Sequence, residues 1–300
     1  MIRITSSTLA SRLTSDLTRL SSTQSRLTQQ MASGKRLSEA SDDVPATGRV
    51  MSYESEKRML QQYERNAQRG LTNIAVSTTT LTSIRQLASK AFNLAPTASS
   101  SGDPAQHTAL ATQLDGYLEQ VLSLANTQVN GSYLFGAEET GSAPFSATRD
   151  AATGRISSVT YTGTTGAAPQ IDVSEGARVA TTTSGAQNQD LETFLNHLVQ
   201  LRDAVAVDDK TATNSIQNAL GDDEDNMVDT LSSLATSQYR IEVTRTQNAT
   251  RFNQLANLSD GESNIDLAET IIQFQSAERS YSAALQAGSK LFQQSLLDYI

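Results

Sequence analysis

The sequence predicts a mainly α-helical protein, in which long antiparallel helices from both chain ends form nested coiled-coil and bundle layers and a small β-rich domain is inserted. Three observations support this fold class. Apolar residues near each end recur at alternating spacings of three and four, which is the seam of a coiled coil. Aromatic residues are scarce at 5% and tryptophan is absent, which favours thin shared seams over one thick core. Only the middle of the chain carries short β-type runs between glycine-bearing turns.

The first expected helix covers residues 6–32, and its end leads into an irregular segment. Ser33-Gly34 supplies a stop, because glycine adopts the left-handed conformation that closes helices. Residues 33–45 break the apolar period, so we expect a joint there. The helix seam consists of Leu13, Leu17, Leu20, Leu27 and Met31, and the joint residues are Gly34, Arg36, Asp42, Asp43 and Pro45.

The next two expected helices are long and begin at prolines. One runs from about residue 46 to 94, with Asp42 and Asp43 near its positive end and Pro96 near its end. The other starts at Asp103-Pro104 and reaches about residue 130. Each has one apolar stripe, so the two helices can share a bundle with later ones.

The middle segment is expected to be a small β domain, and helices follow it. The expected strands are Ile156–Thr162, Gln170–Val173 and Arg178–Thr183. Helices are expected over residues 190–206 and 211–258, then a short break over 259–264. The terminal helix repeats the three-four spacing, with a seam at Leu267, Ile271, Phe274, Tyr281, Leu285 and Phe292.

This order is nested, and it predicts three parts. Residues 1–45 and 259–300 would form an inner coiled-coil domain with its joints. Residues 46–136 and 190–258 would form a helical bundle domain, and residues 137–189 the β insert. The terminal seams are too thin to fold alone, so we expect the chain ends to acquire their order by packing against other copies.

No catalytic, metal or cofactor site is expected from the residues, and we expect no enzyme activity. Cysteine is absent, and His107 and His197 stand apart without a partner motif. The acidic run Asp222–Asp225 lacks the alternating spacing of a calcium loop and is expected near a helix start. Basic residues exceed acidic ones only in residues 1–100 and lack interleaved aromatic residues, so nucleic acid is not an expected partner.

The sequence predicts neither a membrane-spanning segment nor a cleavable secretory signal. The chain has no apolar stretch near the roughly 18–20 residues that span a bilayer. Residues 1–36 lack the continuous apolar region of a cleavable secretory signal.

Four segments carry a resemblance to a known family. The chain opens with Met1-Ile2-Arg3-Ile4-Thr5. Its most recognisable stretch is Met31-Ala32-Ser33-Gly34-Lys35-Arg36-Leu37, followed by Ser41-Asp42-Asp43. A third segment is Asn130-Gly131-Ser132-Tyr133-Leu134-Phe135-Gly136, followed by Ala143-Pro144-Phe145. The fourth runs from Ala283 to Ile300. Together they resemble the bacterial flagellin family, in its hook–filament junction branch, over roughly 1–136 and 190–300.

The resemblance implies a structural function in the bacterial flagellum. It implies a junction or adaptor protein that connects the hook, through hook-associated protein 1, to the flagellin filament. Such proteins assemble into a ring after type III export with an uncleaved signal, and a cytoplasmic chaperone binds their C-terminal helix. The implied location is extracellular, in secreted flagella at the hook–filament junction. The terminal seam residues would then meet in the inner layer, as the assembly interface.

Three alternatives stay open at this point. A filament-forming flagellin is the nearest, and self-polymerisation into long tubes would favour it. A secreted helical enzyme that uses the β insert as its substrate site would need a convergent polar pocket. An intracellular coiled-coil scaffold is disfavoured by the β insert.

Overall fold

The computed structural model describes residues 6–100 and 102–297, and the side chains of residues 6, 7, 9, 10 and 291–297 lie outside this description. The chain divides into two compact units. The terminal unit comprises Met1–Met59 and Arg251–Ile300, and the central unit comprises Leu60–Thr250. The expected β part, residues 137–189, falls inside the central unit, and the three-part division stays a prediction.

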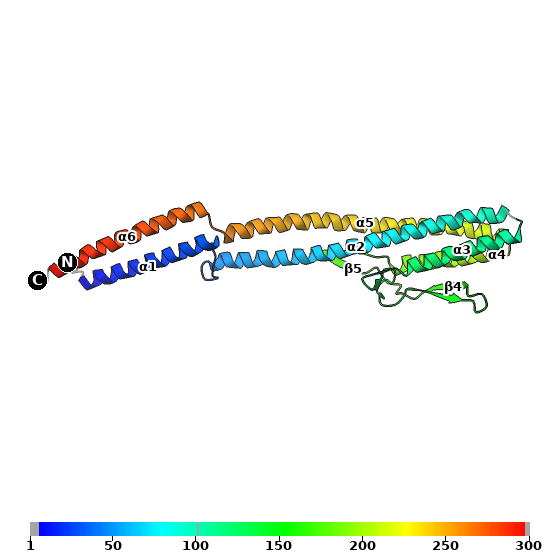
Figure 1. Ribbon diagram of the computed structural model, residues 1–300, viewed down its shortest axis with the longest axis horizontal. Helices are drawn as coiled ribbons and strands as arrows, with labels where there is room; N and C mark the ends of the chain where they lie inside the picture. Colours follow the sequence, from blue (N-terminus) through cyan, green and yellow to red (C-terminus); the bar gives the residue numbers. More distant parts are fainter. Residues whose placement is uncertain (1–5, 101, 298–300) are drawn as a thin grey trace. The chain divides into compact units, whose positions relative to one another are not determined.

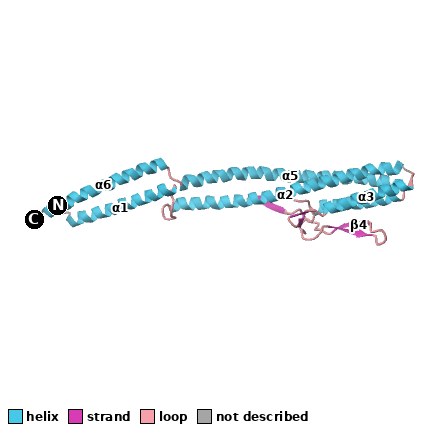
Figure 2. Ribbon diagram, viewed as in Figure 1, coloured by secondary structure: helices cyan, strands magenta, loops and turns pink. Residues whose placement is uncertain are grey.

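Six α-helices dominate the described residues, as the sequence predicts (Figure 1; Figure 2). They are α1 (Ser6–Ser33), α2 (Val44–Ser100), α3 (Pro104–Ala125), α4 (Gly185–Ala206), α5 (Lys210–Ser263) and α6 (Leu267–Leu297). Helices α1 and α6 pack together in the terminal unit, and α3 and α4 pack together in the central unit. The mainly helical fold class is therefore confirmed.

Side-chain caps start most of these helices. Asp43 accepts a hydrogen bond from the Ala46 backbone N–H at 3.0 Å, and Asp103 accepts one from Ala105 at 2.9 Å. Ser184 and Gln187 form a reciprocal capping box at the start of α4. Each cap satisfies backbone donors that a helix start leaves without an intrahelical partner, so short polar residues fix where the helices begin.

Two helices extend beyond their expected ends. Pro96 does not end α2, which continues to Ser100. Ala91, Ala95 and Ala98 are buried on one face of this stretch, so core packing outweighs the backbone hydrogen bond that the proline removes. The expected break over residues 259–264 is shorter, because α5 extends to Ser263.

Three antiparallel hairpins make up the β part, each a separate two-stranded sheet. They pair β1 (Gln128–Val129) with β2 (Ser132–Tyr133), β3 (Phe145–Arg149) with β4 (Ile156–Tyr161), and β5 (Gln170–Ser174) with β6 (Ala177–Ala180). The sequence predicted β4, β5 and, with a later start, β6. It missed β1, β2 and β3, and α3 ends at Ala125 where the sequence suggested a helix to about 130.

Amide side chains attach two of these hairpins to the helices of the central unit. Asn196 of α4 bonds both the N–H and the C=O of Val159 in β4, at 3.0 and 2.8 Å. Asn66 of α2 and Asn248 of α5 donate to the carbonyls of Asp172 and Val173 in β5. Isolated two-stranded hairpins are only marginally stable in water, so these bonds to the helices help to hold the hairpins in place.

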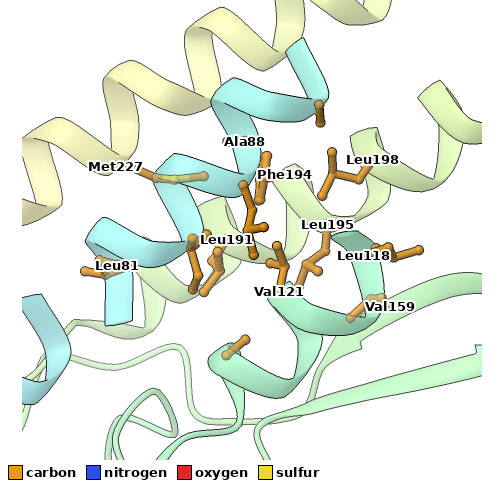
Figure 3. Close-up of a cluster of buried hydrophobic side chains, with 14 of the residues drawn as sticks. Leu81, Ala88, Leu118, Val121, Val159, Leu191, Phe194, Leu195, Leu198 and Met227 are labelled. Atoms are coloured by element: carbon orange, nitrogen blue, oxygen red, sulfur yellow. The ribbon is translucent and has the colours of Figure 1, made fainter. Parts of the chain in front are cut away.

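The central unit contains one continuous hydrophobic core, which the four helices and the hairpins share. Figure 3 shows Phe194, Leu195 and Leu198 of α4 between Leu118 and Val121 of α3 and the facing side chains of α2 and α5. Phe194 and Leu195 are fully buried. The strand residue Val159 joins the same cluster, so strand β4 is part of this core.

Candidate assembly site at the helical ends

Helices α1 and α6 form the pair that the sequence predicts from its two seams. On α1, Leu27 is buried, and Leu13, Leu17, Leu20 and Met31 are half-buried. All five expected α1 residues therefore lie on one covered side of the helix. Phe292 lies outside the described side chains, as do the opening residues 1–5 and the final residues 298–300.

On α6 the covered side consists mainly of small residues. Thr270, Ala277 and Gly288 are buried, and Phe274, Tyr281 and Ala284 are half-buried between them. These positions follow each other at spacings of four and three. Small residues let two helices approach closely. The side of α6 that is covered in a single chain is therefore turned about the helix axis, relative to the side that we expected from the large apolar residues.

Three of the expected α6 residues stay in contact with solvent within one chain. Leu267 is 54% exposed, Ile271 is 39% exposed and Leu285 is 46% exposed. Ile272, at 65%, is exposed on another face of the helix. The helix therefore has exposed apolar residues next to its covered seam, and we call Leu267, Ile271 and Leu285 the α6 edge.

Gly288 lies opposite Leu13, where α1 and α6 come close. A Cβ atom added at residue 288 would lie 2.5 Å from Cδ2 of Leu13, which is shorter than a normal contact. Glycine weakens a helix interior by about 1 kcal/mol relative to alanine, so its presence here reflects close packing. The sequence analysis did not predict this close packing, because Gly288 has no side chain that would mark it as part of a seam.

We expect Gly288→Leu to disrupt the α1–α6 pair. Four added carbon atoms cannot fit against Leu13, whereas the single methyl group of Gly288→Ala can be accommodated by movement of the leucine tip. Hydrogen exchange of the α1 and α6 amides in both purified variants tests this, with Gly288→Ala as the control near the unmodified protein. Unchanged protection in Gly288→Leu would show that the close approach is unimportant.

The joint begins where α1 ends, at Gly34. Gly34 has a φ of +70° and donates its N–H to the Gln30 carbonyl at 2.8 Å, so it closes the helix as expected. The backbone then pairs with the segment between α5 and α6. Arg36 donates its N–H to the Ser263 carbonyl at 2.7 Å, and Ile265 donates to the Gly34 carbonyl at 3.1 Å.

Arg36 is the centre of the joint. Its guanidinium bonds the Asp43 carboxylate at 2.9 Å and, through Nη2, the Glu262 carbonyl at 2.8 Å. Arg49 of α2 binds both carboxylate oxygens of Glu262, at 2.8 and 2.9 Å. Asp42 accepts from the N–H groups of Ser38 and Glu39, both at 2.9 Å, and so holds the loop rather than the helix start.

The joint therefore unites the expected residues with two that sequence reasoning missed. Gly34, Arg36 and Asp43 hold this joint together directly, and Pro45 lies in the first turn of α2, where its missing N–H is harmless. Glu262 and Arg49 were not anticipated. No local signal in the sequence relates residue 36 to residue 262, because the contact joins distant parts of the chain.

The carboxylates of the joint have lowered pKa values. Backbone N–H donors from Glu39 and Ser38 lower the pKa of Asp42, and the Ala46 N–H followed by Arg36 lowers that of Asp43. The hydrogen bond from Arg49 lowers the pKa of Glu262. A donor or cation near a carboxylate favours its charged form, which explains each direction.

These shifts predict that the joint weakens in acid. A lowered pKa in the folded state stabilises the fold above the ordinary carboxyl pKa of about 4, and this contribution is lost as pH falls through the folded value. We expect hydrogen-exchange protection of the Arg36 and Ile265 amides to fall between pH 6 and pH 3, after correction for intrinsic exchange. Equal protection at both pH values would contradict the prediction.

The remaining polar candidates have structural partners. His107 Nδ1 lies 3.1 Å from the Val205 carbonyl, and His197 Nδ1 lies 2.6 Å from Asp223 Oδ2. Burial raises the pKa of Asp223, and the His197 interaction opposes that effect. The acidic run Asp222–Asp225 lies inside α5, not near a helix start as we expected. Within residues 6–100 and 102–297, no cluster of acidic and histidine side chains could hold a metal ion.

Among the described residues, no helix is both long enough and apolar enough to cross a bilayer.

A comparison with known proteins identifies the N-terminal helical region. Residues 4–140, slightly less than half of the chain, match the family model of the bacterial flagellin N-terminal helical region. This part of the chain is therefore similar to bacterial flagellins. Flagellins and their structural relatives are structural proteins rather than enzymes. No curated protein matches the sequence.

Several solved structures share the fold of this protein. A flagellar hook-associated protein of Vibrio parahaemolyticus aligns with a TM-score of 0.65 at 17% identity, covering 74% of this chain and 100% of that one. FlgL of Bacillus cereus aligns at 0.57 and 18% identity, covering 71% and 100%. The flagellar junction protein FlgL of Legionella pneumophila aligns at 0.51 and 12% identity, covering 72% and 100%. The architecture is thus that of flagellar hook-associated and junction proteins.

Proposed function

We propose that this protein is the adaptor between the flagellar hook and the flagellin filament. It would contact the hook through hook-associated protein 1 and the filament through flagellin. The flagellin-type helical region and the junction-protein fold support this function. The observation that carries the proposal is the α6 edge, because a single chain leaves these apolar residues exposed and other copies could bury them.

The α6 edge is suited to burial between copies. Leu267, Ile271 and Leu285 are large apolar residues spaced along one helix, and all three stay exposed when α1 and α6 pair. Large apolar residues that stay exposed on one side of a helix commonly mark a protein interaction site. Copies arranged in a ring would cover these residues with the terminal helices of neighbours, completing the inner layer. The expected α1 residues and Phe274 and Tyr281 would remain inside each pair.

The joint would connect the inner layer to the outer one. Arg36, Asp43 and Glu262 bind each other across two chain segments, so the direction of the terminal helices depends on this network. The proposal includes type III export, with a cytoplasmic chaperone on the C-terminal helix, and an extracellular location at the hook–filament junction. It includes no nucleic acid partner, no membrane insertion and no cofactor.

Deletion of the gene tests the proposal. We expect the deleted cells to keep hooks and to release flagellin monomers into the medium, because filament subunits have no adaptor on which to assemble. Electron microscopy and immunoblots of the medium would record both outcomes, and expression from a plasmid is the control. Filaments that remain attached in the deleted strain would overturn the proposal.

The alternative is a filament-forming flagellin, and the match of residues 4–140 to the flagellin helical region favours it specifically. Purified protein distinguishes the two functions. Polymerisation into long tubes would indicate a filament subunit, whereas short polymers or none would indicate the adaptor.

A further inference from the structure

The central unit contains an open cavity of about 450 Å³ that the proposed assembly function does not use. One wall comes from α2, with Arg65, Arg69 and Asn73. Further lining residues come from the β1–β2 hairpin and from two later segments: Tyr133, Thr140 and, after β6, Thr182. The volume lies within the roughly 300–1,000 Å³ range of small-molecule sites.

The charge of this cavity is unbalanced. Arg65 and Arg69 lie one helical turn apart, and none of the lining residues is acidic. Arg65 donates only to the side chain of Gln62, at 2.6 and 3.2 Å, and Arg69 has no ion pair or hydrogen bond within the described residues. Two like charges at this spacing disfavour each other, so an anion between them would be stabilising.

Six of the seven other arginines of the central unit lie within 4.0 Å of a carboxylate oxygen: Arg85, Arg149, Arg155, Arg178, Arg202 and Arg245. Arg240 is the exception within the described residues. Carboxylates are therefore distributed throughout the unit, and the cavity wall is one place that lacks them. This contrast suggests that the two cavity arginines serve to bind an anion and are not simply solvated charges on a helix surface.

The other lining groups are suited to a hydroxylated molecule. Amides and hydroxyls come from Asn73, Ser132 and Thr140, and the half-buried ring of Tyr133 offers an apolar face. The Thr182 hydroxyl is covered from solvent and has no hydrogen-bond partner among the described residues. Rotation about its χ1 angle would give it a partner in a ligand that occupies the cavity.

We propose that this cavity binds a carboxylate-bearing sugar. The carboxylate would bind the forked donors of Arg65 and Arg69, which suit the planar geometry of that group. The sugar hydroxyls would bind Asn73, Ser132 and Thr140, and an apolar face of the ring would pack on Tyr133. Each class of lining group thereby has a partner.

Titration of the full chain with digalacturonate at low salt tests the proposal, by calorimetry and by NMR of backbone amides. We expect saturable binding with shifts at residues 65, 69 and 133, and weaker binding at high salt because the contact is between charges. Arg65→Gln and Arg69→Gln should each weaken binding at least fivefold. Arg240→Gln is the matched control, because Arg240 is exposed, lies outside the cavity and bonds only the Arg178 carbonyl.

Three outcomes would overturn this inference. The first is absence of saturable binding, and the second is equal binding of a neutral disaccharide or of inorganic phosphate. The third is concentration-dependent self-association that Arg69→Gln abolishes, which would assign the cavity to an acidic side chain of another copy. Circular dichroism of each variant checks that the exposed substitutions leave the fold intact.

Discussion

Leu285→Asp is expected to abolish filament attachment in swimming cells while residues 46–262 stay folded. Leu285 is 46% exposed in one chain, so a charge there has little effect on the isolated protein. In a ring the same carboxylate would be buried between apolar neighbours without a partner, which costs several kcal/mol. Soft-agar swimming and microscopy of attached filaments measure the effect, and circular dichroism of the purified variant measures the fold.

Gln286→Asp is the matched control, because it adds the same charge at an exposed neighbouring position of α6. We expect it to swim nearly as well as the unmodified protein. Normal motility of Leu285→Asp would contradict a role for the α6 edge in assembly. Loss of motility in both variants would point to the added charge itself rather than to burial of Leu285.

Arg202→Ala is expected to destabilise the central unit by about 3–5 kcal/mol, the usual effect of removing one partner of a buried ion pair. Arg202 is buried and donates to Asp115 at 2.9 Å, to Asp203 at 2.9 Å and to the Ile156 carbonyl at 2.7 Å. Burial opposes its charge, but Asp115 and Asp203 outweigh that effect and raise its pKa. Urea unfolding followed by circular dichroism would measure the loss.

Arg155→Ala provides the comparison for Arg202. Arg155 approaches the same Asp115 at 4.0 Å, but its side chain is partly exposed. Exposed ion pairs contribute about 0–1 kcal/mol, so this variant should unfold close to the unmodified protein. Equal destabilisation by both substitutions would show that the burial of Arg202 does not determine its effect.

The helical architecture could be predicted because its determinants are local. The three-four spacing of Leu13, Leu17 and Leu20 identifies α1, and the pair Asp103-Pro104 marks the start of α3 within the sequence itself. The end of α2 could not be predicted, because burial of Ala95 and Ala98 against distant residues overrides Pro96. The short strands β1 and β2 carry too few residues for a β pattern.

The candidate site was predictable in part. The sequence identified a seam on each terminal helix. On α6 it favoured the large residues Leu267, Ile271 and Leu285, which are exposed in a single chain. The residues that are buried there are the small ones, Thr270, Ala277 and Gly288. Small residues at three-four spacing were the available signal. The partners of Arg36 could not be found, since the folded backbone alone brings Glu262 to it.

The contact between Arg36 and Glu262 joins positions 226 residues apart in the chain. It cannot close until nearly all of the polypeptide is present and folded, because loops of such length must form first. A prematurely terminated product that lacks residue 262 would leave Arg36 and Arg49 without this shared acceptor. A chain shortened before residue 262 would therefore lack the bonds that hold the joint together.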